Sequence, residues 1–379
     1  MHPHLDDALN RWQEAGLLDG AQVAALRSFE ADRNAEGASR LRWPAILAAS
    51  MGALLVGAGV LLFVAAHWDE MAPGPRFATV LVLVASFHLL GAVGAERVPR
   101  LAPALHGVGT LALGAGIFLA GQIFNLQEHW PGGVLLWALG ALAGWLLLRD
   151  WVQATLLALL APFWLAGEWV EAADRAWRFS ELVMRVLAAG LLGLAVTYLS
   201  ARREPGDGLA RKALAWVGGL ALLPLAIFAA AAGTASHHGL RPVPDAGPLA
   251  PLGWVLALGL PLAAAWGLRR AGVWMNGVAA LWILVLALGR LPGLAVYAWC
   301  ALGAAGLVAW GLHEFRRERV NLGVAGFALT VLLFYFSDVM DKLDRSLGLM
   351  GLGVLFLAGG WALERLRRRL NARILGGAA

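Results

Sequence analysis

The sequence predicts an all-α protein, a polytopic transmembrane helical bundle of about 12 spans that follows a short N-terminal cytoplasmic helical hairpin. Two observations lead to this fold class. Hydrophobic residues make up 60% of the 379 residues and charged residues only 15%, and the mean hydropathy of +0.68 is too high for a water-soluble domain. The apolar residues also gather in stretches close to the roughly 20 residues that a helix needs to cross a bilayer core.

The apolar stretches define the order of the elements. We expect spans at 43–67, 77–95, 103–124, 134–148, 151–169, 182–200, 213–235, 249–268, 272–289, 293–312, 320–337 and 346–363. The chain then divides into a hairpin at 1–42, the first four spans at 43–150, and the remaining spans with an Arg-rich tail at 151–379.

The positive charges predict the orientation of the spans. Of the 30 Lys and Arg residues, 22 lie before the first span, after the last span, or in the gaps that follow even-numbered spans. Positive loops stay on the cytoplasmic side, so both termini are expected in the cytoplasm. The first span is preceded by 42 mostly polar residues and is too long for the apolar core of a cleavable signal peptide, so we expect it to remain as an anchor.

Residues 1–42 read as two short helices. Their apolar faces consist of Leu5, Leu9 and Trp12 in the first helix and of Val23, Leu26 and Phe29 in the second. Between them, Asp19 is placed as an N-cap with Gln22 as its capping-box partner. The segment carries 7 acidic residues against 5 Arg, which excludes binding to nucleic acid phosphates and leaves a cytoplasmic cap or a hairpin that docks a protein partner.

Composition and motifs limit which other ligands and partners the protein is expected to bind. The sequence pI is about 10.1, and arginines at cytoplasmic helix ends are typical of contact with anionic headgroups of membrane lipids. No metal-ligand spacing, nucleotide loop or catalytic signature is found, so we expect no metal and no cofactor, and an enzymatic activity is disfavoured but left open. The lone Cys300 lies within a span and forms no intrachain disulfide. The oligomeric state is left open.

Two of the spans contain similar sequences, which we call the internal echo. Residues 52–60 resemble residues 109–117 at an offset of 57, both in spans that run outward, which predicts a duplicated helical hairpin. The small residues of this echo let helices approach closely in lipid. The predicted helix-packing residues are Gly57, Gly59, Gly114 and Gly116.

Polar residues at membrane depth predict a pathway or a polar cavity, because such groups are costly in lipid and tend to line cavities. The candidates are Gln122, Asn125, Glu128 and His129 at the outer end of the third span, His67 at the outer end of the first, and His88 and His106 within the second and third. The two intramembrane histidines are candidates for proton handling, with hydrogen-bonded packing as the alternative.

Several stretches resemble known families. Residues 62–68, 121–126 and 136–140, together with the N-terminal hairpin, look like a bacterial family of predicted membrane proteins known only as a domain of unknown function, over roughly residues 5–150. Residues 334–338 and 343–347 look like the end of a related uncharacterised membrane family. The resemblance implies a location in the bacterial inner membrane and no specific activity.

Three classes of function fit these observations. A transporter-like or lipid-handling protein is favoured by the many spans, the echo and the polar end of the third span. A membrane scaffold or regulatory protein that docks a partner through residues 1–42 explains the same topology. An intramembrane enzyme is the third class, and it requires outer His and carboxylate groups to converge.

Overall fold

The computed structural model describes residues 3–38, 72–99, 101–123, 129–177, 180–202, 206–234, 248–289 and 291–339, with single positions at 51, 52, 55, 350, 353, 354, 361 and 365. Within these residues the chain is helical and contains no strand, which confirms the all-α class. The chain forms two compact units, residues 1–76 and 77–379.

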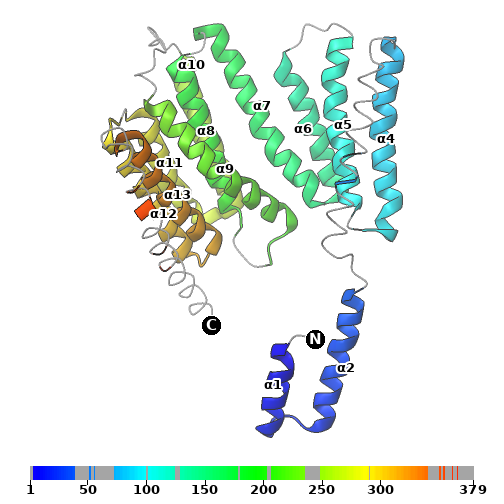
Figure 1. The fold of residues 1–379 in the computed structure, drawn as a ribbon. Coiled ribbons are helices and arrows are strands. Elements are labelled where there is room, and N and C mark those ends of the chain that lie inside the picture. The colour runs from blue at the N-terminus through cyan, green and yellow to red at the C-terminus, as the bar shows by residue number, and fades with distance from the viewer. Residues whose placement is uncertain are drawn as a thin grey trace. The chain divides into compact units, whose positions relative to one another are not determined.

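The first unit contains α1 (Pro3–Glu14) and α2 (Gly20–Ala38), shown in Figure 1. The backbone N–H of Gln22 donates to Asp19 Oδ1 at 2.6 Å, and the N–H of Asp19 donates to Gln22 Oε1 at 2.9 Å, which satisfies two otherwise unpaired donors at the start of α2. Leu9 and Val23 are buried, at 1% and 2% exposed. These two side chains therefore carry the packing between α1 and α2.

The second unit contains the long apolar helices. They are α4 (Pro73–Arg97), α5 (Ala102–Ile123), α6 (Trp130–Leu148), α7 (Trp151–Trp177), α8 (Glu181–Ser200), α9 (Leu209–Thr234), α10 (Leu249–Arg269), α11 (Val273–Leu288), α12 (Leu294–His313) and α13 (Arg317–Phe334), with short turns η2 (Arg270–Gly272) and η3 (Tyr335–Val339). Figure 1 shows α4 to α7 side by side in chain order.

Nine helical stretches in the described residues are long and apolar enough to cross a membrane, and one of them, Leu249–Leu288, has 40 residues. A continuous helix of that length would measure about 60 Å, twice the roughly 30 Å of a bilayer core. The stretch is broken at Arg270, whose φ of 53° lies in the left-handed region, so it contains α10 and α11 as separate spans that pack against each other. Apart from a few single positions, the first and last predicted spans lie outside the described residues, so the count of twelve stays a prediction.

The predicted span ends differ most from the helices in the first half of the unit. The expected span at 134–148 corresponds to α6, which begins at Trp130, because Pro131 suits the first turn of a helix. The expected span at 151–169 corresponds to α7, which continues to Trp177. Glu171, which lay beyond the predicted span, thereby becomes a helical residue together with Glu168.

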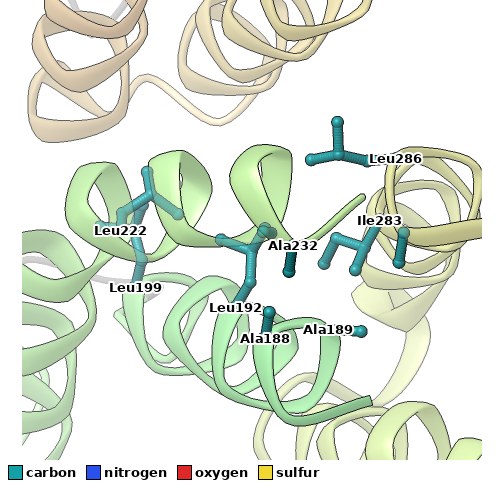
Figure 2. Packing of buried hydrophobic residues seen from close by; sticks show 10 residues of the cluster. Ala188, Ala189, Leu192, Leu199, Leu222, Ala232, Ile283 and Leu286 are labelled. Atoms are coloured by element: carbon teal, nitrogen blue, oxygen red, sulfur yellow. The ribbon is translucent and has the colours of Figure 1, made fainter. Parts of the chain in front are cut away.

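Helix α8 lies at the centre of this unit, where it packs against α7, α9, α10 and α11. Figure 2 shows the core that α8, α9 and α11 share. Its buried residues are Ala188, Ala189, Leu192, Leu199, Leu222, Ala229, Ala232, Ile283, Leu286 and Ala287. Small residues bring the backbones together, since a Cβ at Gly218 would lie 2.3 Å from the backbone N of Leu199.

Helices α12 and α13 form a pair that packs closely on itself. A Cβ at Gly311 would lie 2.8 Å from the backbone N of Val320, and a Cβ at Gly323 would lie 2.8 Å from the carbonyl O of Ala304. By contrast, the pair makes few contacts with α9 and α11. Because the α12–α13 pair packs weakly against the core, a space remains between them.

Candidate functional site

A large groove lies between the α12–α13 pair and the helices α8, α9 and α11. Its volume is about 1190 Å³ and it is partly open. The lining residues come from α8, α9, α11, α12, α13 and η3. The volume exceeds the roughly 300–1,000 Å³ of typical small-molecule pockets, so the groove is large enough for an extended ligand.

Two tryptophans set how closely α12 approaches α11. Trp282 Nε1 donates to the carbonyl O of Trp299 at 2.9 Å, and Trp299 Nε1 donates to the carbonyl O of Trp282 at 3.1 Å. The Trp282 ring fills the space beside Gly303, where a Cβ would lie 2.4 Å from the ring. These bulky side chains keep α12 away from α11 and α9 along part of its length, and the groove follows from that separation.

The lining is mainly aliphatic and aromatic, with polar groups at the two ends. At one end lie Trp310 and His313 in the last turn of α12. At the other end lie Thr234, Tyr297 and Ser337, and Tyr297 Oη hydrogen-bonds with Ser337 Oγ. Helix α12 has 20 residues and is therefore about 30 Å long, so the groove runs the full length of a membrane span.

Charged side chains meet at the Trp310 end of the groove. We call this cluster the arginine junction, and it consists of Arg202, Arg211, Arg269, Glu314, Glu318 and Arg319. It joins the end of α8, the start of α9, the α10–α11 turn and the α12–α13 turn. Arg269 and Arg319 are only 2% and 1% exposed, and both form ion pairs with the Glu314 carboxylate.

Backbone carbonyls and one aromatic ring complete the junction. Arg269 Nη1 donates to the carbonyl O of Ser200 at 2.9 Å, and Arg319 Nη2 donates to that of Arg202 at 3.1 Å. Trp310 Nε1 donates to Glu314 Oε1 at 2.7 Å, while the Arg269 and Arg319 guanidinium carbons lie 5.1 and 4.8 Å from the Trp310 ring centroid. The junction therefore attaches α12 and α13 to α8 and α10.

The Glu314 carboxyl is held in its ionised form. Burial alone would raise the pKa of Glu314, but hydrogen bonds from Arg269, Trp310 and Arg319 and the charge of Arg319 lower that pKa to about 2. The stabilisation from this carboxylate is therefore present above the ordinary Glu pKa of about 4.3 and is lost as the pH falls towards 2.

The structure brings together two of the predicted pathway residues, His88 and His106. Their Nδ1 atoms lie 3.1 Å apart, between α4 and α5. The space for each ring comes from a glycine on the opposite helix, since a Cβ at Gly91 or Gly109 would lie 2.8 or 2.9 Å from the facing imidazole. At this distance the Nδ1–H of one imidazole donates a hydrogen bond to the Nδ1 of the other, so the pair links the two helices.

Further hydrogen bonds continue from this pair into α6 and α7. Thr110 Oγ1 donates to the carbonyl O of His106 at 3.1 Å, and Gln153 Nε2 lies 2.8 Å from the same hydroxyl. Trp137 Nε1 donates to the carbonyl O of Thr110 at 2.8 Å. Four helices are thus connected through one small polar network.

We expect a double-mutant cycle on His88→Leu and His106→Leu to show a coupling free energy of about 0.6–1.7 kcal/mol, because either single variant removes the same interhelical hydrogen bond. The free energy of unfolding in a denaturing detergent titration provides the measurement. Thr330→Val, whose hydroxyl bonds only within α13, should be additive with His88→Leu. Additivity of the two His variants would contradict the hydrogen bond.

His129, another predicted pathway residue, lies between two carboxylates of α7. His129 Nε2 is 2.7 Å from Glu168 Oε2, and Nδ1 is 2.7 Å from Glu171 Oε1. Trp164 Nε1 donates to the second oxygen of Glu168 at 2.9 Å. Among the described residues, no group of three His, Cys, Asp or Glu side chains is arranged to hold a metal ion.

Hydrogen bonds to Glu171 and then to Glu168 raise the pKa of His129 above its ordinary value of 6.5. We therefore expect the imidazole to stay protonated above pH 6.5, and its contribution to stability to fall only as the pH rises through the raised pKa. NMR titration of isotopically labelled histidine gives the pKa. Glu171→Gln should lower it, Glu318→Gln should leave it unchanged, and a wild-type value at or below 6.5 would refute the arrangement.

The other predicted site residues are placed as follows. Gln122 is exposed near the end of α5, and Asn125, Glu128, His67, Gly57 and Gly59 lie outside the described residues. A Cβ at Gly114 would lie 2.2 Å from the Trp137 ring, and one at Gly116 would lie 2.6 Å from Val80. The packing role of these glycines and the internal repeat stay predictions. Of the described candidates, neither Gln122 nor any of the three histidines lines the groove.

Sequence reasoning missed the glutamates that hold His129 and the arginine junction. Glu168 and Glu171 are three residues apart, which places them on one helix face, and this spacing was available in the sequence. The signal for the junction was the presence of Glu314 and Glu318 among arginines of one short loop. The groove had no such signal, because it results from how far α12 stands from its neighbours.

Comparison with known proteins adds a family match. The comparison with curated proteins found no match, and the comparison with solved structures found none either. The match covers α4 to α6 and the start of α7, together with most of the first unit, and does not extend to the groove or the arginine junction. Over residues 10–154, the chain matches the family described as Predicted membrane protein (DUF2157).

Proposed function

We propose that this integral membrane protein is a lipid-handling protein that binds the acyl chains of a membrane lipid in the groove beside α12. The observation that carries the proposal is the groove itself, an apolar space of about 1190 Å³ built from membrane-spanning helices. Because the helices that line the groove are long and apolar enough to cross a membrane, lipids are the ligands that surround them. Filling an apolar space with acyl chains recovers the dispersion contacts that an empty groove lacks.

The aromatic residues of the groove support a lipid ligand. Trp310 and Trp274 line it near one end of the spans, and Tyr297 and Trp299 line it near the other. Aromatic side chains at these two levels are typical of the membrane interfaces, where headgroups begin. A ligand that follows the groove therefore meets apolar surface in the middle and polar or aromatic groups at the ends, as a phospholipid requires.

The weak packing of the α12–α13 pair supports exchange of the ligand. The pair is joined to the core at the arginine junction and through Trp282 and Trp299, and elsewhere it contacts α9 and α11 sparsely. Elements with few buried contacts open at low free-energy cost. The pair can therefore separate from α9 enough to admit a lipid from the side.

We also propose an orientation of the protein in the membrane. The arginine distribution supports an orientation with both termini in the cytoplasm, so that the arginine junction lies at the cytoplasmic level. The resemblance to a bacterial family supports a location in the bacterial inner membrane.

A photoactivatable phospholipid with a diazirine in its acyl chain tests the binding. We expect mass spectrometry of the irradiated, purified protein to find adducts on Cys300, Leu307 and Leu329, which line the groove. Val93 on α4 is 71% exposed and does not line the groove, so it reports general contact with surrounding lipid. Groove adducts should persist after detergent washing before irradiation, whereas adducts on Val93 should disappear.

Two outcomes would overturn lipid binding. One is loss of groove and Val93 adducts in parallel on washing. The other is a cross-link from a benzophenone at position 307 to residues 340–379 that forms whether or not lipid is present. That result would mean that the chain fills its own groove.

A second candidate function is the docking of a protein partner by α1 and α2. It is favoured by the exposure of Trp12, Leu26 and Phe29, at 45%, 40% and 62%, on helices with a net negative charge that disfavours an anionic membrane surface. In-cell photocross-linking from position 29 should give one protein adduct that the control position 14 does not give. Adducts with lipid alone would contradict protein docking.

A further inference from the structure

The two ends of the groove differ in charge. Trp310 and His313 end the groove beside the arginine junction, and Trp310 itself contacts both buried guanidinium groups of the junction. Towards the opposite end, the polar side chains among the described lining residues are the neutral hydroxyls of Thr234, Tyr297, Thr330 and Ser337. A ligand in the groove therefore meets a positive field at one end alone.

The arginine junction has more positive than negative groups. Its four arginines face two glutamates, and Arg269 and Arg319 share the single carboxylate of Glu314. The Arg202 and Glu318 pair is wider, at 3.8 Å, and is partly exposed. Arg211 donates to the carbonyl groups of Ala201 and Leu268. The two carboxylates of the junction therefore neutralise only part of its positive charge.

Arg316, in the same α12–α13 turn, adds to this excess. It is only 8% exposed, and its side chain makes no hydrogen bond or ion pair with the described residues. The Nε atoms of Arg202 and Arg319 are also buried without a hydrogen-bond partner among the residues that the structure describes. The Arg316 nitrogens are not among these buried atoms, so this guanidinium is accessible to a ligand, and a phosphate offers it several charged acceptors.

We propose that the occupant of the groove is an anionic phospholipid, with its acyl chains along α12 and its phosphate group at the arginine junction. This inference rests on the proposed lipid binding and names the class of lipid. Trp310 connects the two parts of the site, since it lines the groove and lies against Arg269 and Arg319. A lipid is favoured over a free phosphate compound because only a lipid satisfies the groove and the arginines together.

Native mass spectrometry of the full-length protein in a neutral detergent tests the inference. The protein is mixed with equal amounts of phosphatidylglycerol and phosphatidylcholine that carry the same acyl chains. We expect bound phosphatidylglycerol to exceed phosphatidylcholine by about fivefold or more, given roughly 1 kcal/mol for each basic side chain near an anionic lipid. Glycerol phosphate in excess should not displace it.

The variant Arg316→Gln should bring the ratio of the two lipids towards one, and the matched control Arg317→Gln should keep the wild-type ratio, because Arg317 is the exposed neighbour. Arg316→Gln removes no ion pair with the described residues, so we expect it to fold about as stably as the wild type.

The outcomes separate this inference from the proposed function. Equal retention of both lipids by the wild type, or an unchanged ratio in Arg316→Gln, overturns the phosphate site and leaves lipid binding intact. Displacement of the lipid by glycerol phosphate would assign the arginine junction to a soluble phosphate compound, and this result also overturns the inference of a lipid phosphate site. Retention of neither lipid refutes the proposed function itself.

Discussion

Replacing Glu314 with Ala is expected to lower the free energy of unfolding by about 3–5 kcal/mol. The substitution leaves Arg269 and Arg319, at 2% and 1% exposed, without the carboxylate that both contact. It also removes the acceptor of the Trp310 indole N–H. Unfolding in a denaturing detergent titration, followed by tryptophan fluorescence, gives the difference.

Glu318→Gln is the matched control for this substitution. Glu318 lies in the same segment, but its side chain is 33% exposed and its ion pair with Arg202 spans 3.8 Å. A partly exposed ion pair at this distance contributes roughly 0–1 kcal/mol, so the control should unfold close to the wild type. Equal destabilisation by the two substitutions would show that Glu314 does not hold the junction together.

Replacing Gly306 with Trp is expected to weaken lipid retention about 5- to 150-fold, which corresponds to roughly 1–3 kcal/mol for inserting a large side chain into filled space. Gly306 lines the groove, and a Cβ built on it meets nothing within 4 Å. The new side chain therefore extends into the groove without disturbing the helix backbones. Native mass spectrometry of the purified protein measures how much lipid remains bound.

Gly259→Trp is the control for bulk alone. Gly259 is an exposed glycine in the middle of α10, where an added Cβ would also meet nothing within 4 Å, and it does not line the groove. This variant should retain lipid as the wild type does. Loss of lipid in both variants would point to a general effect of added bulk, and loss in neither would show that the groove is not the binding site.

The helical membrane class was predictable from the sequence because it depends on composition and on the spacing of apolar stretches. Ten of the predicted spans coincide with helices in the described residues, including the division between α10 and α11. That division followed from Arg269 and Arg270, whose charges mark the end of a span. The ends of α6 and α7 were less predictable, because Trp130 and Glu171 are polar or amphipathic residues that remain helical beyond the hydrocarbon core.

The candidate site was less accessible to sequence reasoning. His88 and His106 were identified singly as costly groups in lipid, yet their contact depends on how α4 crosses α5. The polar residues Gln122 and His129 pointed to the end of α5, whereas the groove lies beside α12. A lining of Leu, Ala and Trp has no sequence signature, because the same residues face lipid on every other helix.

A cryo-electron microscopy map of the full-length protein in lipid nanodiscs tests the central claim most directly. We expect elongated density along α12, separate from the polypeptide, between α9 and the α12–α13 pair, with its polar end beside Trp310. Density for residues 340–379 in that space, or a groove closed by contact of α12 with α9, would contradict lipid binding at this site.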